Sequence, residues 1–230
     1  MSYPRGEENP PRIRFAAIGG AWALYQQQMG TWMLIGVITG VILICAQSIL
    51  SFLIPTPRPE GFNLRALLAT IYSPSHIVLG VVVGTVYGVI EGAIIHAALK
   101  QIRGEGTSVS ALLEVGDVMG KLVLLGLVES VLSTAAALLC ILPSFVVWSL
   151  LMFAVPLVVD QKMEPLDAVR QSFNMLKSHW LTAFLFNLAA ALVSTAGAIL
   201  CCVGILLSMP LYYLSIALLY DDFVRGAVEP

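Results

Sequence analysis

Residues 181–220 read LTAFLFNLAAALVSTAGAILCCVGILLSMPLYYLSIALLY, an apolar run without a charged side chain. Residues 122–159 form a second apolar run of similar length, in which Glu129 is the single charge. A helix needs about 20 apolar residues to cross a bilayer, so each run has room for two spans and a tight turn. The sequence therefore predicts a polytopic membrane protein of the all-α class.

The composition agrees with this class. Of the 230 residues, 58% are hydrophobic and 11% are charged, whereas about 25% of a typical soluble domain is charged. The net charge of -2 argues against nucleic acid as a partner. We expect a disordered cytoplasmic tail at 1–11 and a single membrane domain at 12–230. All four cysteines fall inside apolar runs and are expected to be small buried apolar residues.

The apolar stretches divide into six expected spans, at about 31–54, 75–98, 121–142, 144–160, 180–203 and 205–221. Ten of the twelve Lys and Arg residues lie on the side of the two termini, and Arg58 and Arg65 lie on the other side. Basic loops stay in the cytoplasm, so both termini are expected on the cytoplasmic side. The protein itself is expected in the cytoplasmic (inner) membrane of a prokaryote. Trp32 and Trp180 are expected at the membrane interface.

An internal repeat is suggested by two similar octapeptides. Residues 133–140 read STAAALLC and residues 194–201 read STAGAILC. Aligning Ser133 with Ser194 also aligns Asp160 with Asp221 without a gap. This constant offset favours a duplication, in which each copy is a helical hairpin of two spans.

Amphipathic segments at 12–29, 107–119 and 165–178 precede the three pairs of spans. We expect them to lie along the cytoplasmic interface, with ordinary cytoplasmic connectors as the alternative. The chain is then three units, at 12–98, 107–160 and 164–221, and the first unit carries an additional short helix at 63–72.

The C-terminal part of the chain resembles a known family. Residues 165–180 read PLDAVRQSFNMLKSHW and combine an acidic-Ala-x-x-x-Ser pattern with a basic-x-x-Trp entry into the next span, here Asp167, Ala168, Ser172, Lys177 and Trp180. With the following Val203-Gly204 turn, Pro210 and Tyr220-Asp221, this segment is similar to the YciC-like integral membrane proteins. It also looks like the membrane domain of some glycerophosphodiester phosphodiesterases. The resemblance implies a six-span fold with no established catalytic activity, and it supplies no active-site residues.

Four glycines recur at every fourth position of the second expected span: Gly80, Gly84, Gly88 and Gly92. This spacing lets another helix approach the backbone closely, so we expect a helix-packing seam (a glycine zipper), with a pore lining as the alternative. Gly36 and Gly40 in the first span offer a partner face.

A layer of polar side chains is expected inside the membrane, formed by Glu91, Glu129 and Asn187. At 1.5 Å per residue they lie about 13, 12 and 10 Å from the cytoplasmic ends of their spans. An intramembrane carboxylate costs about 2.5–3.5 kcal/mol, so its retention needs a reason. Either Glu91 and Glu129 face a cavity and bind a cation or proton, or one or both are protonated and fix the bundle through hydrogen bonds to Tyr87, Ser133 or Asn187.

Signatures of enzymes are absent from the sequence: there is no H-E-x-x-H, G-x-S-x-G or P-loop pattern. Asp160, Asp221 and Asp222 end two spans and are expected to be solvated, with a metal site as the less favoured alternative. We therefore expect a non-enzymatic scaffold or accessory factor without cofactor, metal or catalytic residues. Its expected partners are the lipid bilayer and a membrane protein or a second copy of the chain, and the alternative function is a small transporter or channel using Glu91 and Glu129.

Overall fold

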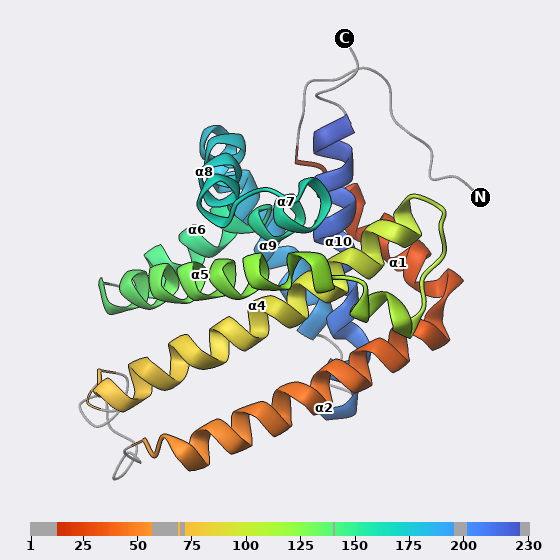
Figure 1. Ribbon diagram of the computed structural model, residues 1–230. Helices are drawn as coiled ribbons and strands as arrows, with labels where there is room; N and C mark the ends of the chain where they lie inside the picture. The colour runs from red at the N-terminus through yellow and green to blue at the C-terminus, as the bar shows by residue number, and fades with distance from the viewer. Residues whose placement is uncertain (1–12, 57–68, 70–71, 140, 196–201, 226–230) are drawn as a thin grey trace.

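The computed structural model describes residues 13–56, 69, 72–139, 141–195 and 202–225, and this part of the chain is helical without strands (Figure 1). The expected tail at 1–11 and nearly all of the short helix expected at 63–72 lie outside the described residues. The α-helices are α1 (Ala16–Gln27), α2 (Met29–Leu53), α4 (Pro74–Ile102), α5 (Met119–Leu139), α6 (Ile141–Leu151), α7 (Ala154–Gln161), α8 (Pro165–Leu176), α9 (Trp180–Thr195) and α10 (Cys202–Arg225). The all-α class is confirmed.

Four helical stretches of the described chain are long and apolar enough to cross a membrane. They are Met29–Leu53, Pro74–Ile102, Ser144–Gln161 and Pro165–Thr195. Several apolar helices of this kind are compatible with an integral membrane protein, while the count of six spans stays a prediction. Two other long helices are α5, with 21 residues, and α10, with 24.

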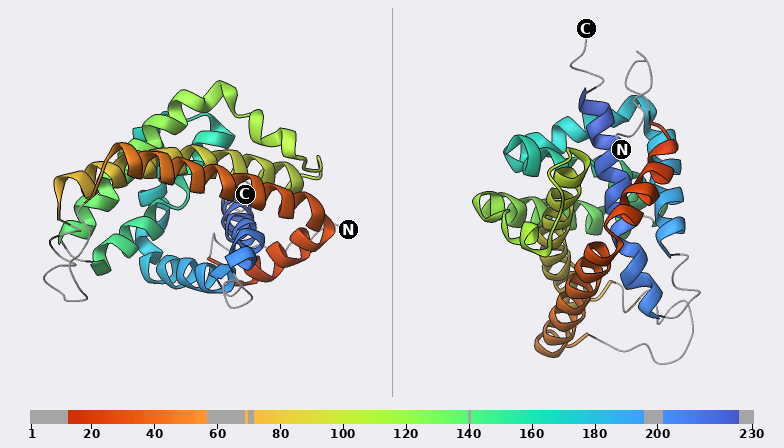
Figure 2. Two further views of the ribbon diagram at one scale, coloured as in Figure 1. Left: turned by 90° about the horizontal axis from the view of Figure 1, so that it is seen from below. Right: turned by 90° about the vertical axis from the view of Figure 1, so that its right-hand side faces the viewer.

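The long helices form two groups with different directions. In Figure 1, α2, α4 and α5 run side by side, and α10 crosses them steeply. The second view in Figure 2 shows the same crossing from the side. α4 packs most extensively against α5, and α10 contacts α1, α2, α4 and α9. Every residue from Pro210 to Asp221 in α10 is buried, so this helix forms the centre of the core.

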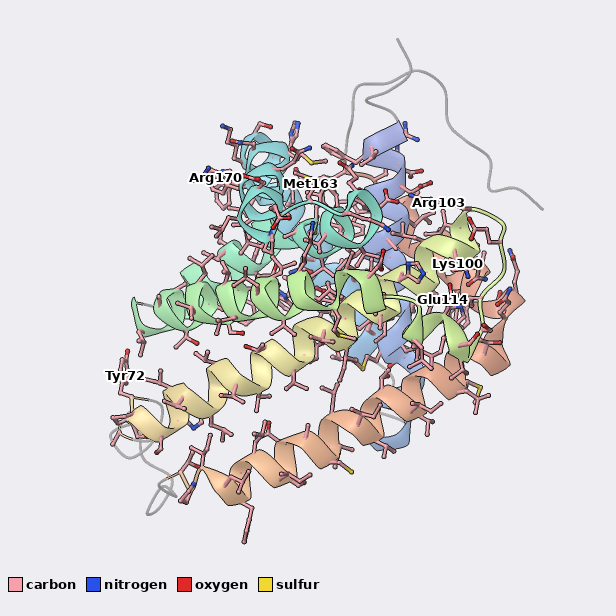
Figure 3. All side chains as sticks on the ribbon, in the orientation of Figure 1. Tyr72, Lys100, Arg103, Glu114, Met163 and Arg170 are labelled. Carbon is pink, nitrogen blue, oxygen red and sulfur yellow. The ribbon has the colours of Figure 1, made fainter. Side chains whose placement is uncertain are left out.

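Ion pairs join the ends of these helices on one side of the molecule. Lys100 at the end of α4 lies 2.7 Å from Glu114, and Lys121 at the start of α5 lies 2.7 Å from Glu164. Lys162, after α7, pairs with Asp117. Figure 3 shows Lys100, Arg103 and Glu114 together at one end of α4, with Tyr72 at the opposite end. The hydrogen bond from Lys100 lowers the pKa of Glu114, and the one from Lys162 lowers the pKa of Asp117.

The fourth expected span, 144–160, is broken at Met152 and Phe153, between α6 and α7. Pro156 explains the break, because it has no N–H and its ring clashes with the carbonyl four residues earlier. The Ser172 hydroxyl of α8 hydrogen-bonds to the backbone at this break: Oγ donates to the Leu150 carbonyl at 2.7 Å and accepts from the Phe153 N–H at 3.2 Å. Ser172 is fully buried. One side chain thus satisfies two backbone groups that the break would otherwise leave without a partner.

The helix boundaries correct several expectations. Pro143 stands between the third and fourth expected spans, where a turn was expected, but α6 already begins at Ile141, so Pro143 lies in the first turn of this helix, where proline is well tolerated. Gly204 likewise lies inside α10. Residues 107–119 form two short 3-10 turns, Val109–Leu113 and Gly116–Val118, before α5 begins.

Two side chains also lie elsewhere than expected. The Trp32 indole is fully buried, because its N–H donates to the buried Gln101 amide at 2.6 Å. Cys45 is exposed on α2, where the neighbouring apolar side chains of Val41, Ile42 and Ile44 are exposed as well. Cys140 and Cys201 lie outside the described residues.

Candidate functional site

The glycines of α4 face α5. A Cβ at Gly84 would lie 2.6 Å from Ser130 Oγ, one at Gly88 would lie 2.8 Å from Gly126 Cα, and one at Gly92 would lie 2.6 Å from the Leu122 side chain. At Gly80 nothing lies within 4 Å, so this glycine takes no part in the contact. Gly36 and Gly40 are buried in α2, but the residues that meet Gly84, Gly88 and Gly92 belong to α5.

The contact pairs fix the register of the two antiparallel helices. Residues 84, 88 and 92 of α4 stand opposite 130, 126 and 122 of α5, so the paired numbers have a constant sum. Glu129 is therefore level with Thr85, six positions from Glu91. At 1.5 Å per residue the two acids are offset by about 9 Å along the helix axes. They therefore do not share one depth, as their distances from the cytoplasmic ends of the expected spans had suggested.

The two carboxyl groups nevertheless interact. Glu91 and Glu129 are both partly buried, and each lies within electrostatic range of the other. Among the described residues, no hydrogen bond or ion pair to either carboxyl is found. The hydrogen bonds expected from Tyr87, Ser133 or Asn187 to the acids are thus not made in the described part of the chain. This leaves two like charges in an apolar region, which burial and mutual repulsion both disfavour.

Asn187 joins three helices instead of bonding to the acids. Its Nδ2 donates to Ser149 Oγ in α6 at 3.1 Å, and its Oδ1 accepts from the Tyr212 hydroxyl in α10 at 2.7 Å. Asn187 is 3% exposed, so its amide is satisfied inside the core. Tyr212 also lies within electrostatic range of Glu91 and Glu129, which makes it the residue that connects the amide to the acidic pair.

A pocket of about 150 Å³ adjoins this cluster, between α4, α6, α9 and α10. Half of its lining residues are aromatic: the residues are Tyr87, Trp148, Ala191, Ser194, Thr195, Met209, Tyr212 and Tyr213. The rings contact each other, with Trp148 and Tyr212 stacked at 5.8 Å between centroids and Tyr212 edge-on to Tyr213 at 5.2 Å. The Tyr213 hydroxyl donates to that of Tyr87. Glu91 lies one helical turn beyond Tyr87 and does not line the pocket.

The acids at the ends of α7 and α10 form a separate cluster around Arg103. Arg103 Nη1 lies 2.6 Å from Asp160, and its Nε lies 3.8 Å from Asp221. The Tyr220 hydroxyl donates to Asp160 at 3.2 Å. Asp221 is 7% exposed, so these acids are not simply solvated as expected. The hydrogen bond with Asp160 raises the pKa of Arg103 further, which keeps the guanidinium charged. In the described part of the chain, no group of three or more His, Cys, Asp or Glu is arranged to hold a metal.

Sequence reasoning missed Tyr212, Tyr213 and Trp148. A signal was present, because tyrosine and tryptophan inside an apolar run carry polar groups that need partners. Together with Tyr87, these rings come from three segments that lie far apart in the sequence, and the pattern of each segment alone does not bring them together.

Comparisons with known proteins place the chain near uncharacterized proteins. No family model matches it, and no solved structure does. An uncharacterized protein of Mycobacterium bovis and one of Mycobacterium tuberculosis strain CDC 1551 are each 29% identical over 110 residues, and one of strain H37Rv is 28% identical over the same length. These matches cover 48% of this chain and 34% of the relatives. The chain thus spans about a third of the length of the curated relatives it matches.

Proposed function

We propose that this chain is a non-enzymatic integral protein of a prokaryotic cytoplasmic membrane, where it acts as a scaffold or accessory factor that holds lipid or a membrane partner. Six helices cross the bilayer in this proposal: α2, α4, α5, the pair α6 and α7, α9, and α10. Both termini lie in the cytoplasm, and α1 and α8 lie along the cytoplasmic interface. The resemblance to YciC-like proteins and the three repeated units belong to the same proposal.

The apolar surface of α1 and α8 carries the proposal. α1 buries its small residues, among them Ala17 and Ala21, and α8 buries Ala168 and Ser172. α8 exposes Leu166 and Phe173, and α1 exposes Trp22, with the exposed Phe15 directly before its first residue. Met29 and Trp180, which begin α2 and α9, are exposed as well. A helix that exposes large apolar side chains on one face, as α8 does, is stabilised by the boundary between headgroups and acyl chains.

Two further features support this arrangement. α8 and α9 change direction where they meet at the short turn Lys177–His179 (Figure 2), so α8 does not simply extend α9. α2 exposes Leu34, Ile42, Ile44, Ile49 and Phe52, an apolar surface that needs lipid or another protein against it.

The alternative is a small transporter or channel, and one observation favours it. Glu91 and Glu129 interact with each other and, among the described residues, have no basic partner. Intramembrane acids of this kind are frequently proton or cation relays. The scaffold is preferred because the other buried polar groups described above, Gln101, Ser172 and Asn187, bond to other helices and hold the core together.

An ion-flux experiment separates the two functions. The full chain is reconstituted in vesicles with a pH-sensitive dye inside, and proton and potassium gradients are applied. The scaffold predicts no flux above that of empty vesicles. A flux that Glu91→Gln abolishes, while the thermal stability of the variant is unchanged, would replace the scaffold by the transporter.

The topology is tested by cysteine labelling. In a cysteine-free background, Glu105→Cys, at an exposed position, should react with an impermeant maleimide only after the cytoplasmic side is opened, and Thr56→Cys should react in intact cells. Labelling of both positions from the same side would exclude the proposed six spans.

A further inference from the structure

The aromatic pocket has a marked electrostatic preference. Among the described residues, none that lines it is basic. Glu91 lies within electrostatic range of Tyr87, Tyr212 and Tyr213, and Glu129 lies within range of Tyr212. Aromatic rings carry a negative face, which attracts cations, most strongly where the site is desolvated. An anionic group such as a phosphate is therefore disfavoured in this pocket, and a cation is favoured.

The pocket also contains a buried polar group without a partner in the described part of the chain. Ser194 lines it and is 6% exposed, yet its Oγ makes no hydrogen bond there. A buried hydroxyl without a partner costs about 1–3 kcal/mol, so a ligand that offers a hydrogen-bonding group beside its cation would relieve this cost. Thr195 differs from Ser194, because its hydroxyl donates to the Ala191 carbonyl at 2.8 Å.

The size of the pocket limits the ligand. A cavity on the order of 150 Å³ takes up a molecule as large as benzene, which is comparable to a trimethylammonium group. This volume is too small for a whole lipid. A methylated ammonium also suits the lining better than a primary ammonium does, since it offers apolar methyl groups to the rings and needs few hydrogen bonds.

We propose that this pocket binds the trimethylammonium group of a quaternary ammonium compound, with Tyr87, Trp148, Tyr212 and Tyr213 around the cation. Glu91 and Glu129 lie near the rings, where a bound cation favours the ionised form of a carboxyl group, and Ser194 bonds to a hydroxyl or ester oxygen of the same compound. This site goes beyond the proposed scaffold function and does not depend on it. A free cation such as choline and the choline headgroup of a lipid share the required chemistry.

Choline binding to the full chain in a neutral maltoside detergent tests the proposal. The control ligand is 3,3-dimethyl-1-butanol, which has the shape and the hydroxyl of choline but no charge. We expect saturable binding of choline and at least ten-fold weaker binding of the neutral compound. Trp148→Leu should weaken choline binding at least five-fold, whereas Trp22→Leu, which removes a tryptophan that is 48% exposed on α1, should leave it unchanged. Glu91→Gln is a second variant that weakens binding without removing a ring.

Three outcomes would overturn the site. In the first, choline and its neutral analogue bind with equal affinity. In the second, Trp148→Leu and Glu91→Gln both bind choline as tightly as the parent protein does. In the third, Trp22→Leu loses as much choline affinity as Trp148→Leu. Nanodiscs identify the source of the cation. If choline binds in phosphatidylglycerol but is displaced in phosphatidylcholine, the site takes the lipid headgroup, and if it binds in both, the site takes a free cation.

Discussion

The exchange of Gly88 for alanine is the sharpest test of the contact between α4 and α5. In a helix, alanine is favoured over glycine by about 0.5–1 kcal/mol. At Gly88 the new Cβ would lie 2.8 Å from Gly126 Cα, a backbone atom that cannot rotate away. Overpacking typically costs about 1–3 kcal/mol, and the upper part of this range applies where two backbones must separate. We therefore expect a net destabilisation of about 1–2 kcal/mol.

The other glycines of the same helix provide a graded control. Gly80→Ala meets nothing within 4 Å, so only the gain in helix propensity remains and the variant should be neutral or slightly more stable. Gly92→Ala meets the Leu122 side chain, which can change its rotamer but is fully buried, so its effect should lie between the other two. The expected order of stability is Gly80→Ala, then Gly92→Ala, then Gly88→Ala.

Thermal unfolding in detergent, followed by tryptophan fluorescence at one scan rate, measures this order. For a chain of this length, 1 kcal/mol shifts the Tm by about 2–4 °C. Gly88→Ala should therefore unfold about 2–8 °C below the parent protein. If Gly88→Ala and Gly80→Ala have the same Tm, the close approach of the two backbones does not exist and the register derived from it is wrong.

Three further predictions concern polar contacts, each measured by the same unfolding assay. Ser172→Ala should cost about 1–3 kcal/mol because Leu150 and Phe153 lose their partner, whereas the exposed Ser48→Ala should change stability by less than about 0.5 kcal/mol; equal effects would contradict the repair of the helix break. Arg103→Gln should cost about 1–3 kcal/mol because Asp160 and Asp221 lose their cation, and the exposed Arg170→Gln is its control. The pKa values of Glu114 and Asp117 are lowered in the folded state, so these groups stabilise the fold above about pH 4, and this stabilisation is lost as the pH falls through the folded pKa. The Tm should therefore decrease as the pH is lowered below about pH 4, and it should decrease less steeply in Asp117→Asn.

Composition was sufficient to predict the class of the fold, since apolar runs as long as those at 122–159 and 181–220 are typical of membrane helices. The break between α6 and α7 was not predicted, although Pro156 stands within the fourth expected span. A proline inside a membrane helix is tolerated where a neighbouring side chain satisfies the freed backbone groups. Here that side chain is Ser172, which belongs to a different helix, so nothing beside Pro156 in the sequence marks the connection.

The glycine pattern predicted a packing face but not its partner. Gly84, Gly88 and Gly92 lie on one side of α4, and the paired residues of α5 are a serine, a glycine and a leucine. These have no common type, so no pattern marks α5 as the opposing helix. The depths of Glu91 and Glu129 were misjudged for a related reason. Lys100 and Lys121, at the cytoplasmic ends of the second and third expected spans, were assumed to lie at the same depth. The register instead places Lys121 opposite Ala93, which is about 10 Å from Lys100 along α4.

The fold treats its two pairs of acids differently, and this difference bears on the pocket. Asp160 and Asp221 occupy equivalent positions of the suggested repeat, and Arg103, which comes from outside the repeat, lies between them. A half-buried guanidinium thus balances two acids that burial alone would leave unfavourably charged. Glu91 and Glu129 are another interacting pair, but the groups near them are the tyrosines of the pocket rather than a basic residue. A quaternary ammonium held by those rings would neutralise charge on Glu91 and Glu129, in the same way as Arg103 neutralises charge on Asp160 and Asp221. The two clusters would then follow one rule, in which each acidic pair shares one cation.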